Sequence, residues 1–126
     1  MARRVCLFVA ILALLPLPVR AAETYLDLLK ENFMTGVVMN GDPRIPDEIE
    51  GGVVVCLAEA FVKANIPAED LAKLDQAVVD GTIEMDPLAG HYAMLASDRN
   101  ALLLMSMEAE QICPEILKAY HAAKNG

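Results

Sequence analysis

The side chains with the clearest chemistry are two cysteines far apart in the sequence, Cys56 and Cys113. A third, Cys6, lies in an apolar N-terminal segment that we expect to be removed. In an oxidising compartment two remaining cysteines predict one intramolecular bond. That bond would close a loop of 57 residues, worth about 4 kcal/mol in unfolded-state entropy. The sequence therefore predicts a Cys56–Cys113 disulfide, with two buried free thiols as the alternative.

Catalytic chemistry is not indicated by the other side chains. The two histidines, His91 and His121, form no His-x-x-x-His pattern, and no serine has the flanking glycines of a hydrolase nucleophile. Neither cysteine has a histidine at the spacing of a zinc site. His121 lies near the C-terminus of the last predicted helix, where the helix dipole favours a positively charged side chain, so we expect a structural role for it. The sequence thus predicts a non-enzymatic chain with no catalytic residue, metal site or cofactor.

Methionine is the residue type that keeps a metal-binding alternative open. Thioether sulfur is a ligand that Cu(I) prefers, and the pairs to consider are Met105 with Met107 and His91 with Met94. Residues 105 and 107 point about 200° apart on a helix, so they do not chelate one ion together. We expect the methionines to fill irregular core space instead.

Four carboxylates, Asp42, Asp47, Glu48 and Glu50, gather around a proline-rich turn. A calcium loop needs oxygen ligands at alternating positions and a central glycine, and this stretch lacks that pattern. Acidic side chains are favoured at the positive end of a helix. We expect them to form a solvated cluster that stabilises the start of the following helix.

The first 21 residues have the features of a signal peptide. Arg3 and Arg4 precede an apolar run over residues 5–15, and small residues end the segment at Ala21, with cleavage after Ala22 as the alternative. The run is shorter than the roughly 20 residues that cross a bilayer. These features predict a periplasmic or secreted protein with a single domain over residues 22–126.

The domain that follows is strongly acidic. Removing Arg3, Arg4 and Arg20 lowers the 10 basic residues to 7 against 18 acidic ones, so the formal charge changes from −8 to −11. Such a surface repels phosphate backbones and anionic lipids, which disfavours roles on nucleic acids and membranes. It suits either solubility or binding to a basic partner, and the sequence leaves the identity of a partner and the oligomeric state open.

The stretch Asn100–Cys113 is the most apolar segment after the N-terminus, and we expect it to organise the fold. Its composition favours a helix that neighbours bury on several sides. Pro114 biases Cys113 away from helical dihedrals, which predicts a break before a short terminal helix. The predicted core-facing positions recur at spacings of three and four: Leu102, Met105, Ala109 and Ile112.

The rest of the chain also predicts helices, over about 23–39, 46–65, 67–80 and 87–95. Thr24 with Asp27 and Asp86 before Pro87 are the expected N-terminal caps. Ser97-Asp98 either starts a new helix or lies inside one long helix.

The stretch Gly51–Val55 would suit a strand by propensity. We prefer a helix in which Gly51 and Gly52 let a neighbour approach closely. The predicted fold is an all-α bundle of four to six short helices joined by one disulfide.

These features favour a secreted or periplasmic binding module that acts on a protein partner. An acid-responsive chaperone of the holdase type is the first alternative. Protonating its carboxylates would change the formal charge from −11 towards +9, with 7 basic side chains and 2 histidines charged, and would expose apolar surface. A copper-binding protein is the second alternative.

Overall fold

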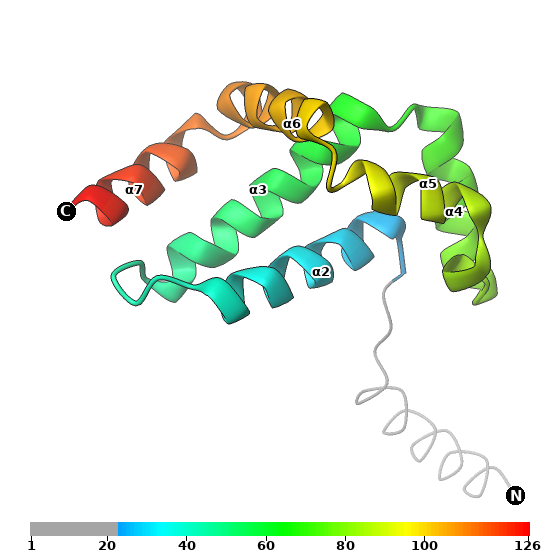
Figure 1. The fold of residues 1–126 in the computed structure, drawn as a ribbon, viewed down its shortest axis with the longest axis horizontal. Helices are drawn as coiled ribbons and strands as arrows, with labels where there is room; N and C mark the ends of the chain where they lie inside the picture. Colours follow the sequence, from blue (N-terminus) through cyan, green and yellow to red (C-terminus); the bar gives the residue numbers. More distant parts are fainter. Residues whose placement is uncertain (1–22) are drawn as a thin grey trace, which may run out of the picture.

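The computed structural model describes residues 23–126, so the signal-peptide prediction for residues 1–21 lies outside the described residues. This part of the chain is an all-α bundle, as predicted (Figure 1). Its elements are α2 (Tyr25–Asn40), α3 (Asp47–Asn65), α4 (Ala68–Asp80), the short 3-10 helix η1 (Ile83–Met85), α5 (Pro87–Leu95), α6 (Arg99–Ile112) and α7 (Pro114–Asn125).

Helix α3 is the centre of the bundle. It packs against α2, α6 and α7, and Figure 1 shows α2 along one side of it and α6 and α7 along the other. Its buried residues include Ala58, Ala60 and Phe61, each with no exposed surface. Small side chains of this kind let neighbouring helices approach closely, while Phe61 fills the space between them. Helices α4 and α5 with η1 form the end of the molecule to which the C-terminus of α3 leads.

The prediction that Asn100–Cys113 organises the fold and is buried on several sides was wrong. Helix α6 buries Ala101, Met105 and Ala109 against its neighbours and leaves a second face open to solvent. Ile112, which was predicted to face the core, is 37% exposed. The long apolar run therefore covers two faces, one packed on the bundle and one without a partner in the described chain.

The predicted caps and breaks were confirmed. Thr24 and Asp27 form a reciprocal capping box at the start of α2. The Asp86 carboxylate accepts a hydrogen bond from the Leu88 amide, at 2.8 Å, and so caps α5. The Asp98 carboxylate accepts one from the Ala101 amide, at 3.1 Å, so α6 is a fresh start and not the continuation of one long helix.

The glycine pair lies inside α3, so the strand alternative for Gly51–Val55 was wrong. A β-carbon built at Gly52 would lie 2.8 Å from Cδ1 of Ile116, whereas one at Gly51 would meet only Cε of Met34, at 3.9 Å. The close approach that the glycine pair predicts therefore occurs at Gly52, where α7 crosses α3.

Carboxylates connect helices that are distant in the sequence. Asp75 accepts a hydrogen bond from the Tyr25 amide at 2.8 Å and so joins α4 to the start of α2. Asp70 accepts one from the Tyr92 hydroxyl at 2.7 Å and joins α4 to α5. Burial, together with this hydrogen bond, raises the pKa of Tyr92 to about 12. Within residues 23–126, no helix combines the length and the apolar content that crossing a membrane requires.

Candidate binding groove

A groove of about 570 Å³ lies between α2, α3, α6 and α7. This volume falls in the usual range of ligand sites, about 300–1,000 Å³. Its lining is mostly apolar and comes from four helices and the 41–46 loop. The apolar side chains that line it include Phe33, Val54, Leu57, Leu102, Met105 and Tyr120.

Charged side chains gather at the end of the groove where the 41–46 loop faces α7. Asp42, Glu50 and Lys124 line this end, and Figure 1 shows the loop and the C-terminus of α7 on the same side of the molecule. Lys124 Nζ lies 6.0 Å from the ring centroid of Tyr120. Neither Glu50 nor Lys124 forms an ion pair within the described residues.

Asp42 is neutralised within its own loop. Its carboxylate accepts hydrogen bonds from the backbone amide and the guanidinium of Arg44, at 2.6–3.1 Å. These hydrogen bonds lower the pKa of Asp42 to about 2. The charges left to act on a ligand at this end are therefore the carboxylate of Glu50 and the ammonium of Lys124.

A second hollow adjoins this charged end and makes it more acidic. It measures about 620 Å³ and shares Gly41, Asp42, Ile45 and Glu50 with the groove. Its additional charged side chain is Asp47. The predicted acidic cluster therefore divides: Asp42, Asp47 and Glu50 line the two hollows, while Glu48 lines neither.

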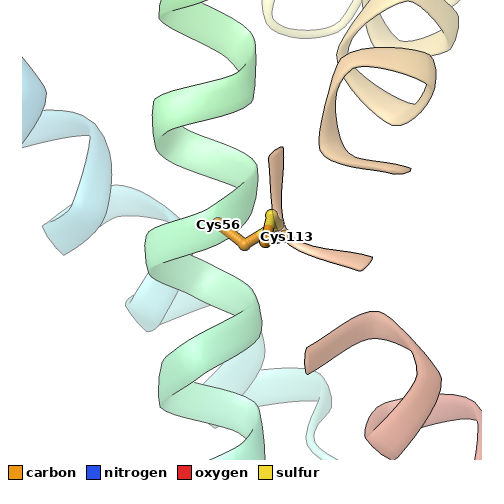
Figure 2. Close-up of a disulfide and its surroundings, with 2 residues drawn as sticks. All are labelled: Cys56 and Cys113. Atoms are coloured by element: carbon orange, nitrogen blue, oxygen red, sulfur yellow. A yellow bond between two sulfur atoms is a disulfide. The ribbon is translucent and has the colours of Figure 1, made fainter. Parts of the chain in front are cut away.

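The disulfide lies outside the lining of the groove, at the junction of α6 and α7. Cys56 and Cys113 lie at bonding distance, with 6.1 Å between their Cα atoms (Figure 2). Cys56 is buried in the middle of α3, and Cys113 lies between the two last helices. The bond therefore holds the start of α7 against α3, and α7 supplies Tyr120 and Lys124 to the groove.

The histidines and methionines lie mainly on the surface. His91 and His121 are both exposed, and among residues 23–126 no three His, Cys, Asp or Glu side chains are grouped to hold a metal ion. The prediction that methionines fill the core was wrong for most of those described. Met105 is buried, whereas the exposed fractions of the others are 90% for Met85, 79% for Met94, 56% for Met107 and 39% for Met34.

Sequence reasoning did not find the groove. Its lining positions are drawn from segments that start at residue 32 and end at residue 124, so no local motif contains them. The one local signal is the acidic turn after α2, which by itself predicts only a helix start. The groove has an apolar floor and separated charges at one end. This arrangement suits binding of an amphipathic ligand.

The chain matches no protein-family model, and comparisons with curated proteins and with solved structures find no match either.

Proposed function

We propose that this protein is a non-enzymatic binding module whose groove holds a basic amphipathic segment of a partner protein. The observation that supports it is the combination of an apolar floor with the carboxylate of Glu50 at the rim, which has no ion-pair partner among residues 23–126. An amphipathic helix can place its apolar side chains on such a floor and a lysine or arginine at the rim.

The charge of the whole domain favours the same kind of partner. With a formal charge of −11 after loss of the N-terminal arginines, the domain attracts basic segments over a distance and repels acidic ones. Such long-range attraction raises the association rate more than it raises the final affinity. With Asp42 paired to Arg44, the free charges of the rim are the carboxylates of Glu50 and Asp47 and the ammonium of Lys124, so the rim keeps a net negative charge that favours a cationic ligand.

We place the binding event in the periplasm or outside the cell. The disulfide is compatible with an oxidising compartment, and the predicted signal peptide supports export. The partner that carries the basic segment would therefore be an exported protein as well.

A labelled helical peptide of about five turns, with leucine on one face and lysine on the other, tests this function. We expect fluorescence anisotropy to detect binding that the Glu50→Lys variant weakens by about tenfold. The matched control is Glu48→Lys, which makes the same charge change on the same helical turn but outside the groove. We expect less than a threefold effect there. Absence of binding, or equal effects of the two variants, would contradict the proposal.

A second candidate function, the acid-responsive holdase, is supported by the carboxylate contacts between helices. Asp70 and Asp75 join α4 to α5 and to α2 by accepting one hydrogen bond each, so loss of these two contacts would release α4 from its neighbours. Light scattering of an aggregating client protein at about pH 3 is the test, and unchanged aggregation would reject this function.

A further inference from the structure

The outer face of α6 carries an apolar surface that the described chain does not cover. Leu103 is 57% exposed, Leu104 is 48% exposed and Met107 is 56% exposed. We refer to these three residues as the α6 stripe. Figure 1 shows α6 along the outside of the bundle, and the exposure of the three side chains shows that other helices of the described chain do not cover them.

The stripe lies opposite the buried face of the same helix. At about 100° per residue, its three side chains fall within an arc of about 100°. Asn100 and Gln111 continue the stripe at its two ends, and both are exposed and uncharged. The stripe is thus a narrow neutral face on a strongly acidic protein.

Two opposite charges lie on one flank of the stripe, one towards each end. Arg99 and Glu110 project within about 20° of one another around the helix and lie about 16 Å apart along it. Both are exposed, and neither forms an ion pair within residues 23–126. A two-fold axis that lies in the contact plane, perpendicular to α6, makes the second copy of the helix run antiparallel and keeps the same flank on the same side. The N-terminal end of this flank in one protomer then lies opposite the C-terminal end of the same flank in its partner.

The positions of these charges match the centre of the stripe. An axis midway between Arg99 and Glu110 passes between Leu104 and Met105, within one residue of the middle of the stripe, which spans residues 103–107. With this register, Leu104 meets its own copy and Leu103 lies beside the partner's Met107. The same register brings Arg99 of each protomer opposite the partner's Glu110, which gives two ion pairs.

From this match we infer that the α6 stripe is a homodimer interface in which two copies of α6 pack antiparallel about a two-fold axis. A basic surface would satisfy only Glu110 and an acidic one only Arg99, whereas a second copy satisfies both. The inference is independent of the groove, because no residue of the stripe lines it.

The interface is small, so the dimer is weak. Three half-exposed side chains offer a few hundred Å², below the roughly 800 Å² per partner of a standard stable interface. The negative charge of each protomer opposes association further. We expect a dissociation constant on the order of 100 µM, with monomer predominant in dilute solution.

Exchanging the charges of Arg99 and Glu110 tests the register of the dimer. The dissociation constant is measured by sedimentation equilibrium of the disulfide-bonded chain over residues 22–126. Arg99→Glu alone and Glu110→Arg alone each place like charges opposite one another at two symmetric sites, and we expect each to weaken dimerisation by about tenfold. The double variant restores both pairs with reversed sign and should return to within threefold of the unmodified protein. Both substitutions suit the helix dipole, so neither weakens α6 itself.

Three outcomes would overturn the inference. The unmodified chain could stay monomeric at millimolar concentration, the single variants could dimerise as well as the parent, or the double variant could fail to recover. A Leu104→Ser variant adds a check on the apolar contact, and we expect it to weaken the dimer by about tenfold while circular dichroism shows an unchanged helix content.

Discussion

The adjacent glycines of α3 allow a direct test of how closely α7 packs on α3. Gly51 and Gly52 have the same helical environment along the chain, but a β-carbon at Gly52 would contact Ile116 at 2.8–2.9 Å and one at Gly51 would not come closer than 3.9 Å to Met34. Replacing each glycine by alanine therefore makes the same local change with and without steric conflict.

The expected magnitudes follow from these distances. Alanine is about 1 kcal/mol more favourable than glycine in a helix interior, so Gly51→Ala should raise the free energy of unfolding by about 0.5–1 kcal/mol. Gly52→Ala has the same helical gain but overpacks the α3–α7 contact, at a cost of about 1–3 kcal/mol. We therefore expect Gly52→Ala to lower the free energy of unfolding by about 0–2 kcal/mol.

Urea unfolding of the oxidised domain, followed by circular dichroism, measures both values under the same conditions. A Gly52→Ala/Ile116→Ala double variant removes both Cδ1 and Cγ1 of Ile116, so in the Ile116→Ala background the Gly52→Ala substitution should no longer be destabilising. If Gly52→Ala proved as stabilising as Gly51→Ala, α7 would not lie against α3 at this point, and the assignment of α7 as a wall of the groove would fail with it.

Reducing the Cys56–Cys113 disulfide should lower the free energy of unfolding by about 2–5 kcal/mol, measured by urea unfolding with and without reductant. Intact mass should be two units low with no free thiol before reduction, and free thiols in the native protein would contradict the bond. Thr24→Ala removes the capping box of α2 and should cost about 1 kcal/mol in thermal unfolding, whereas no loss would show that the cap is redundant. The pKa of Tyr92 is raised to about 12, so its contribution to stability is complete below the ordinary value near 10 and is lost as pH rises through 12. Absorbance titration should show this late ionisation, and Asp70→Asn should shift it to lower pH; an unshifted midpoint would refute the role of Asp70.

The helix limits were predictable because caps act over three or four residues. Thr24 with Asp27 and Asp86 with Leu88 each place a side-chain oxygen within reach of a nearby amide, and Pro114 restricts the residue before it. These interactions are complete within one turn of helix. A sequence read without its fold therefore contains all the information that they need.

The central helix was not predictable in the same way. The long apolar run that contains Leu103, Leu104 and Met107 predicted that this segment would be the central helix. The hydrophobicity of a side chain measures the free energy of its transfer out of water, and it does not tell how many neighbours surround that side chain in the fold. Helix α3 is central because Gly52, Ala58 and neighbouring small side chains let other helices come close. Packing of this kind depends on partners distant in sequence, and the same holds for the groove.

The acidic charge of the domain bears on both of its open apolar surfaces, the outer face of α6 and the groove. A formal charge of −11 limits non-specific association, which allows the domain to keep two apolar surfaces open. Because Glu50 lines the groove and Arg99 flanks the α6 stripe, one substitution at each site should separate the two proposed interactions. Glu50→Lys should weaken peptide binding and leave dimerisation unchanged. Arg99→Glu should weaken dimerisation and leave peptide binding unchanged. A variant that changed both would show that α6 and the groove act as one surface.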